Sequence, residues 1–183
     1  MCTLLLVLIS ISLTAQENYV FTSSGISPKE SIITFPGVSK DQLYQKALRF
    51  VKETYRSPDD VIVTTVENEM IRFTGADSEA FCFKALGMKK CTAAIYTVQL
   101  DFKDGKMRFQ PVEMYYNTEA SRYSSGGRQY IDLDNGEDKM YRRNGEPRSM
   151  FRFLVPAIGD VLNKNLSDIQ DYIENEEELN SNW

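Results

Sequence analysis

The segment from Ala94 to Gln110 limits what this chain can fold into more than any other part of it. Its first part alternates between apolar and mostly polar side chains, and the residues that share the apolar side are Ala94, Tyr96, Val98, Leu100 and Phe102. A period of two is typical of a strand with one buried face. Asp104-Gly105 then gives a strong hairpin-turn signal before a return strand. We therefore expect an antiparallel sheet with a hydrophobic core against one face.

The segments before this hairpin predict one helix and three more strands. Residues 31–35 form a short apolar run that a Pro-Gly pair ends. Residues 39–42 have the form of a capping box, and an apolar stripe at helical spacing follows to about Tyr55. Residues 61–66 and 70–74 are rich in β-branched residues, which is typical of strands separated by a turn.

The return strand carries a proline. Pro111 cannot donate a hydrogen bond to a neighbouring strand, so it predicts an edge position or a bulge. Val112, Met114 and Tyr116 continue the apolar pattern with the opposite parity. We expect the strand to continue beyond Pro111.

Residues 118–147 form an insert of low hydrophobicity. Within it, Asn135-Gly136 predicts a second hairpin between residues 130–134 and 137–141. Several tyrosines lie in or next to this insert, and they could either pack a long loop onto the sheet or offer a contact surface for a glycan or a protein.

The chain after Ser149 predicts a second helix. Its apolar residues recur at helical spacing, and Pro156 is expected to kink or restart the helix. From Asp168 onward there are six acidic residues and no basic one. We expect residues 168–183 to form a solvated acidic helix that frays into a tail.

The predicted order is strand, helix, four strands, helix. This order favours an α+β architecture in which one antiparallel sheet carries both helices on one face. A chain of 183 residues has the size of one domain. We expect a flexible N-terminal segment over residues 16–29, a single domain over residues 30–167 that includes the insert 118–147, and the acidic tail over residues 168–183.

Residues 1–15 have the pattern of a secretory signal peptide. They carry no charge, and the apolar core Leu4–Leu13 is followed by a small residue at Ala15. The run is too short for a membrane-spanning helix, which needs about 20 apolar residues. We therefore expect a signal peptide over residues 1–15, an exported protein that is periplasmic or secreted, and no transmembrane segment in the mature chain. The alternative is that the run is a buried first helix or strand.

Cys82 and Cys91 are the cysteines that remain once residues 1–15 are set aside. They are not in a CxxC spacing, so the sequence gives no support to a thioredoxin-like or zinc site. In an oxidising compartment they could form a disulfide across a loop that contains glycine. The alternative is two free thiols, one of them buried as a small apolar residue.

The composition excludes several kinds of site. There is no histidine, which removes Ser-His-Asp triads and histidine-ligated metals, and the net charge of −5 disfavours nucleic-acid binding. The acidic run at residues 132–138 resembles a calcium loop, but the required register puts Ile131 and Leu133 at ligand positions. A hairpin with solvated acids is favoured over a weak calcium site. We predict no catalytic, cofactor-binding or metal-binding residue, and no cofactor.

Two stretches of the chain resemble a known family. These are Phe35-Pro-Gly-Val-Ser-Lys-Asp-Gln-Leu-Tyr44, with the helix that leads into Ser57-Pro-Asp-Asp-Val-Ile62, and the hairpin of residues 96–109 around Lys-Asp-Gly-Lys. They are similar to secreted proteins, mostly from Bacteroidetes, described as a domain of unknown function with a TBP-like fold. The resemblance covers about residues 30–116 and a final helix. It implies a TBP-like strand-helix-four-strand-helix fold with a curved antiparallel sheet, and it implies no activity.

The sheet face that the helices leave uncovered is the predicted contact surface. By parity it carries polar residues, and we select Arg72, Gln99 and Arg108 as its candidate contact residues. The expected function is an exported, non-enzymatic binding or interaction module of the cell envelope, with an unidentified envelope protein or glycan as partner and no nucleic acid. The alternative is a hydrolase that uses carboxylates on a glycan.

Overall fold

The computed structural model describes residues 17–85, 87–118, 120 and 125–180. The predicted signal peptide at residues 1–15 lies outside this part of the chain, as do the last three residues of the predicted acidic tail. No helix in the described part is long and apolar enough to cross a membrane.

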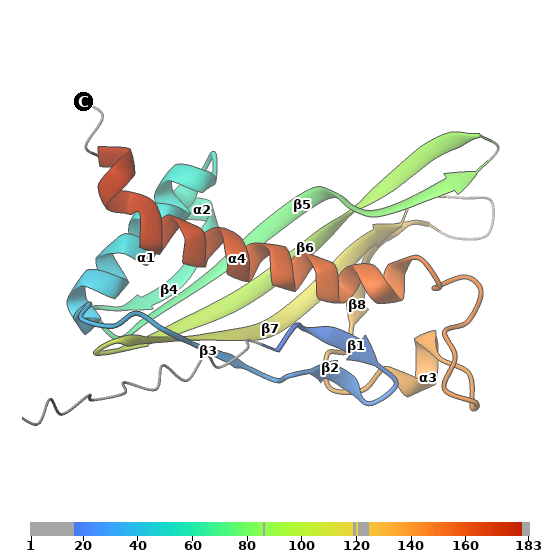
Figure 1. Cartoon of the computed structure of the whole chain (residues 1–183). Helices are drawn as coiled ribbons and strands as arrows, with labels where there is room; N and C mark the ends of the chain where they lie inside the picture. Colours follow the sequence, from blue (N-terminus) through green and yellow to red (C-terminus); the bar gives the residue numbers. More distant parts are fainter. Residues whose placement is uncertain (1–16, 86, 119, 121–124, 181–183) are drawn as a thin grey trace, which may run out of the picture.

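One curved antiparallel sheet forms the centre of the molecule (Figure 1). Its strands follow the order β3-β7-β6-β5-β4, and β8 pairs with β7 beside β3. The strands are β3 (Ser31–Thr34), β4 (Ile62–Val66), β5 (Met70–Ala85), β6 (Met88–Lys103), β7 (Lys106–Thr118) and β8 (Gly127–Ile131). The predicted α+β class and the order strand, helix, four strands, helix are confirmed, with additional small elements around this framework.

Two long helices cover one face of the sheet (Figure 1). The helices are α1 (Lys40–Thr54), α2 (Pro58–Val61), α3 (Glu137–Met140) and α4 (Leu154–Asn180). The predicted capping box begins α1, because the Ser39 hydroxyl accepts a hydrogen bond from the Gln42 backbone N–H at 3.3 Å, while the Gln42 side chain accepts one from the Ser39 N–H at 3.0 Å. α4 runs across the sheet, so the core lies between it, α1 and the inner face of the strands.

The predicted buried face of β6 is confirmed. Ala94, Val98 and Leu100 are completely buried, and Tyr96 and Phe102 are nearly so. On α1, Phe50 is buried as expected, whereas Leu48 is only half-buried, because it lies at the margin of the helix stripe.

The hairpin of β5 and β6 is longer than the sequence predicted. The predicted strand over residues 70–74 continues to Ala85, and the expected cysteine loop is part of the paired strands. The pairing shifts register between Asp77 and Phe81, where β5 has a bulge. Because a bulge disrupts the alternation of apolar and polar side chains, the second half of β5 does not show a clear strand pattern in the sequence.

Pro111 marks a bulge, one of the two predicted outcomes. The β6–β7 register shifts between Thr97 and Val98, opposite this proline, and Met114 then lies on the buried face as its reversed parity predicted. β3 pairs with residues 106–109 of β7 and β8 pairs with residues 114–118. Pro111 lies between the two partners, where the absence of an N–H on proline is tolerated.

The N-terminal segment corrects one prediction. The sequence predicts a flexible segment over residues 16–29, but the described part of it, residues 17–29, contains β1 (Val20–Thr22) and β2 (Gly25–Ser27), which form a separate hairpin. Tyr19, Phe21 and Ile26 are buried in the same core as the main sheet. The segment is therefore an integral part of the domain.

Asn163 and Gly159 explain how this segment attaches to α4. The Tyr19 backbone N–H donates to the Asn163 side-chain oxygen at 2.7 Å, and the Asn163 amide donates back to the Tyr19 carbonyl at 3.0 Å. A Cβ atom at Gly159 would lie 2.4 Å from that carbonyl oxygen, so only glycine permits the close approach. The Asn163 side chain thus pairs with the backbone N–H and C=O of Tyr19, as a neighbouring strand would.

The predicted hairpin at Asn135-Gly136 is wrong. Gly136 precedes the short helix α3 with a φ of −91°, which is not the positive φ that a type I′ turn requires. Its N–H donates to the Ser23 carbonyl at 2.9 Å, and a Cβ atom there would lie 2.4 Å from the Thr22 carbonyl oxygen. The glycine serves a close approach to the β1–β2 turn, a contact that local sequence does not indicate.

The C-terminal helix also differs from the expectation of a solvated tail. α4 begins at Leu154, so Pro156 lies in its first turn, where no intrahelical N–H is needed and no kink arises. Beyond Asp168, Ile169 and Ile173 are buried against the core, so the first part of the acidic segment is packed. Asp168, Asp171 and Glu174 are exposed on the other side of the same helix.

Candidate functional site

The uncovered face of the sheet carries a continuous row of polar contacts. Arg72 on β5 lies directly opposite Gln99 on β6, and its Nε donates to the Gln99 side-chain oxygen at 3.2 Å. The Gln99 amide nitrogen donates in turn to both carboxylate oxygens of Asp101, at 3.0 and 3.1 Å. Three side chains from two strands are therefore joined into one network.

Arg108 extends this row across β7 to the edge of the sheet. It lies opposite Asp101, and its Nε and one terminal nitrogen donate to the same carboxylate oxygen of Asp101 at 3.1 and 3.0 Å. The other terminal nitrogen donates to Glu30, beside β3, at 3.3 Å. Hydrogen bonding to Asp101 raises the pKa of Arg108 further above its already high ordinary value. We call Glu30, Arg72, Gln99, Asp101 and Arg108 the polar ladder.

The polar ladder remains accessible to solvent. The side chains of Arg108 and Glu30 are 41% and 42% exposed, and that of Asp101 is 27% exposed. Exposed ion pairs contribute about 0–1 kcal/mol each to stability. The arrangement is thus a weak source of stability and an ordered set of donors and acceptors facing outward.

The structure brings the three predicted contact residues together. Arg72, Gln99 and Arg108 belong to one network, although the two arginines are linked only through Gln99 and Asp101. Glu30 was not predicted, because its position depends on the pairing of β3 with the distant strand β7. The sequence signal that would have suggested it is an acidic residue directly before the predicted strand at residues 31–35.

An aromatic pair joins β7 to β8, several residues along β7 from Arg108. The rings of Tyr115 and Tyr130 have centroids 5.4 Å apart, and the Arg128 guanidinium lies 5.5 Å from the centroid of Tyr115. Tyr130 is 47% exposed. Tyr141 instead is buried and donates to the Phe21 carbonyl at 2.7 Å, so the tyrosines divide between packing and surface.

The acidic run at residues 132–138 has a structural use. The Asp132 side chain accepts hydrogen bonds from the backbone N–H groups of Asp134 and Asn135, at 3.0 and 3.2 Å. Asp134 also forms an ion pair with Lys29 at 2.8 Å. These contacts are typical of a turn, and the side chains of Asp132 and Asp134 are exposed to solvent.

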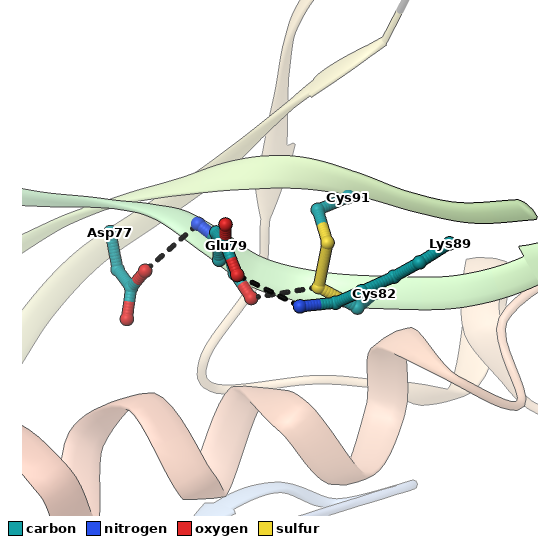
Figure 2. Close-up of a disulfide and its surroundings, with 5 residues drawn as sticks. All are labelled: Asp77, Glu79, Cys82, Lys89 and Cys91. Atoms are coloured by element: carbon teal, nitrogen blue, oxygen red, sulfur yellow. Dashed lines mark hydrogen bonds and ion pairs between the residues drawn. A yellow bond between two sulfur atoms is a disulfide. The ribbon is translucent and has the colours of Figure 1, made fainter.

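Cys82 and Cys91 form a disulfide between β5 and β6 (Figure 2). They are directly opposite each other in the register, with Cα atoms 4.0 Å apart. Glu79 lies beside them and pairs with Lys89 at 2.8 Å, an interaction that lowers the pKa of the Glu79 carboxyl (Figure 2). Glu79 and the two sulfur atoms are close enough to share a metal ion, but sulfur atoms joined in a disulfide are not thiolate ligands.

Removing this disulfide is expected to lower the free energy of unfolding. A cross-link that closes a loop of this length stabilises a chain by roughly 2.5–3 kcal/mol in the chain-entropy model. Thermal unfolding with and without reductant measures the effect in the wild-type chain. The double variant Cys82→Ser, Cys91→Ser is the control, and its melting temperature should not respond to reductant. An equal response in both proteins would contradict the prediction.

A cavity of about 570 Å³ lies at the far end of the covered face. Its lining residues come from β5, β6, β7 and the segment leading into α4 and are Phe81, Lys90, Cys91, Thr92, Tyr116, Asn117, Thr118, Ser149, Met150, Phe151, Phe153 and Leu154. Sequence reasoning missed this cavity, because it assigned the apolar residues after Ser149 to a helix. The sequence feature that could have indicated this cavity is the aromatic-rich run ahead of a proline.

Comparisons with known proteins support the fold. Residues 30–117 match the model of the family described as a domain of unknown function (DUF4468) with TBP-like fold, which confirms the resemblance. A crystal structure of a DUF4468 family protein from Bacteroides ovatus matches with a TM-score of 0.61 at 14% identity, covering 79% of this chain and 84% of that one. A TBP-like protein from Parabacteroides distasonis matches with a TM-score of 0.58 at 13% identity, covering 80% and 91%. None of the curated proteins matches this chain.

Proposed function

We propose that this chain, which carries the DUF4468 domain with TBP-like fold over residues 30–117, is an exported, non-enzymatic binding module of the cell envelope. Its proposed contact surface is the polar ladder on the uncovered sheet face. The partner would be an envelope protein or a glycan.

The polar ladder is the observation that carries this proposal. It presents arginine, glutamine and carboxylate groups that are already held in place by one another, at 3.0–3.3 Å, before any partner arrives. Side chains that are fixed in advance lose less conformational freedom on binding. A rigid, hydrogen-bonding and solvent-accessible face is therefore suited to a polar partner.

Two features support export. The uncharged apolar run at residues 1–15 has signal-peptide form, and the disulfide between Cys82 and Cys91 suits an oxidising compartment. An exported location also argues against a nucleic-acid partner. The polar ladder also contains two arginines and two carboxylates, which is not the basic surface that phosphate contacts require.

A carboxylate-based hydrolase acting on a glycan is the second candidate. The observation that favours it is that Asp101 and Glu30 both accept hydrogen bonds from Arg108, so two carboxylates lie near each other on an exposed face. Glycosidases use such pairs. Against it, both oxygens of Asp101 are already occupied by Gln99, and one also by Arg108. Release of reducing sugar from an envelope glycan by the wild-type chain would favour this candidate.

The triple variant Arg72→Ala, Gln99→Ala, Arg108→Ala tests the binding surface. We expect it to capture much less of any partner from the envelope fraction of the producing cells than the wild-type chain does. Its free energy of unfolding should fall by only about 1–2 kcal/mol, because the lost pairs are partly exposed. Affinity capture followed by mass spectrometry, with thermal unfolding of each protein, measures both quantities.

The matched control is Gln45→Ala, Lys52→Ala, Arg56→Ala. These exposed residues lie on or just after α1, on the covered side of the sheet. Their replacement removes two positive charges and one amide, as the ladder variant does. This variant should capture the partner as well as the wild-type chain does. Equal capture by the ladder variant, or recovery of the native chain only from the cytoplasm, would contradict the proposal.

A further inference from the structure

The cavity at the end of the covered face is a second, separate candidate site. The β5–β6 hairpin reaches past the first turn of α4, and this leaves the inner face of the sheet without a helix above it (Figure 1). Phe81, Thr92 and Tyr116 line the cavity from the strands, and residues 149–151, 153 and 154 line it from the other side. A volume of about 570 Å³ is in the range of small-molecule sites.

Most of the side chains that line the cavity are apolar. Phe81 and Tyr116 form an edge-to-face pair with ring centroids 6.3 Å apart, and Leu154 is buried beside them. Two further lining residues are exposed to solvent, Met150 at 82% and Phe153 at 44%. Large apolar side chains exposed around a concave surface are typical of a site that an apolar ligand covers.

Cations lie in and next to the lining of the cavity, and the carboxylate beside its lining residue Cys91, that of Glu79, is already paired with Lys89. Lys90 is the only charged residue among the described residues that line it. Arg142 donates to the Ser149 hydroxyl at 3.0 Å, and the Arg152 guanidinium lies 4.4 Å from the ring centroid of Phe153. Both arginines therefore adjoin lining residues. A ligand that places an apolar body in the cavity would meet cations at its polar end.

We propose that this cavity binds an amphipathic anion, a molecule with a single apolar chain and a carboxylate head. The chain lies in the cavity against Phe81, Tyr116 and Leu154, and the head lies next to Lys90. An uncharged or cationic amphiphile lacks the attractive contact between its head group and Lys90. The proposal does not depend on the polar ladder, which lies on the other face of the sheet.

Decanoate is the first probe, and decyltrimethylammonium is its cationic counterpart with the same chain length. Isothermal titration calorimetry of the full mature chain should show one decanoate site and much weaker binding of the ammonium compound. Chemical-shift changes in nuclear magnetic resonance spectra should map to the lining residues. Lys90→Glu should weaken decanoate binding by about fivefold or more and favour the ammonium compound, because the head-group charge is reversed.

Two controls separate this site from general effects. Lys103→Glu makes the same charge change at another exposed lysine of β6 and should leave decanoate binding unchanged. Phe153→Ala should weaken both probes, whereas Ile32→Ala, which truncates another exposed apolar residue, should weaken neither. Equal binding of the two probes, no decanoate binding, or shifts confined to the uncovered face would overturn the proposal. So would co-sedimentation with phosphatidylglycerol vesicles without binding of free decanoate, because the chain would then recognise a bilayer.

Discussion

Replacing Tyr19 by alanine is expected to lower the free energy of unfolding by about 3–5 kcal/mol, the range for buried aromatic residues. The Tyr19 side chain is 1% exposed, and its ring packs 5.7 Å from that of Phe109, centroid to centroid. The change also opens a cavity under the N-terminal hairpin, which is held to α4 through Asn163. Chemical denaturation of the wild type and the variant measures the difference. A loss below 1 kcal/mol would mean that residues 17–29 are the flexible segment that the sequence suggested.

Tyr19→Phe separates the hydroxyl from the ring. The Tyr19 hydroxyl donates to the Phe109 carbonyl at 3.0 Å, so its removal should cost about 1–2 kcal/mol. Burial raises the pKa of Tyr19 to about 12 from its ordinary value of 10.0. Because the folded pKa is the higher one, the unfolded chain loses this proton first. The wild type should therefore lose stability relative to Tyr19→Phe between about pH 10 and pH 12, and the difference should be constant below pH 10.

Phe102→Ala is expected to have an effect of similar size. Phe102 is 4% exposed, and its ring meets that of Tyr44 edge to face with centroids 5.8 Å apart, which joins β6 to α1. Truncation removes the buried ring and leaves a cavity between sheet and helix, at a cost of about 3–5 kcal/mol. Equilibrium unfolding in urea is a suitable measurement.

Ile32→Ala is the control for Phe102→Ala. Ile32 lies in the same sheet but is 60% exposed, so its truncation should change the free energy of unfolding by less than about 0.5 kcal/mol. A larger effect of Ile32→Ala than of Phe102→Ala would show that the faces of the sheet are assigned the wrong way round, and equal effects would contradict the prediction.

The location of the contact surface follows in part from the sequence. The alternation along β6 assigns Gln99 and the other polar residues to the uncovered face, because successive side chains in a strand point to opposite sides. The sequence does not show that Gln99 lies opposite Arg72, because this pairing depends on the bulge after Asp77, which shifts the register between β5 and β6. The pairing of Asp101 with Arg108 does follow from the sequence, because the two-residue turn at Asp104-Gly105 places Lys103 opposite Lys106 and so sets the register of the strand residues next to it.

Features that depend only on neighbouring residues could be predicted from the sequence. The Ser39–Gln42 capping box, the Asp104-Gly105 turn and the apolar stripes of both long helices each need only contacts within a few residues. Local preferences and periodicity are therefore enough to predict them.

Features that join distant parts of the chain are visible only in the folded structure. Tyr19 and Asn163 are 144 residues apart in sequence, and their contact requires the absence of a side chain at Gly159. Gly136 similarly does not adopt the predicted turn conformation. It allows close contact with the Thr22 carbonyl instead. The cavity beyond α4 depends on where that helix begins relative to the long hairpin. In each case the free energy comes from burying apolar surface and pairing backbone groups across the fold, and no local pattern in the sequence encodes that geometry.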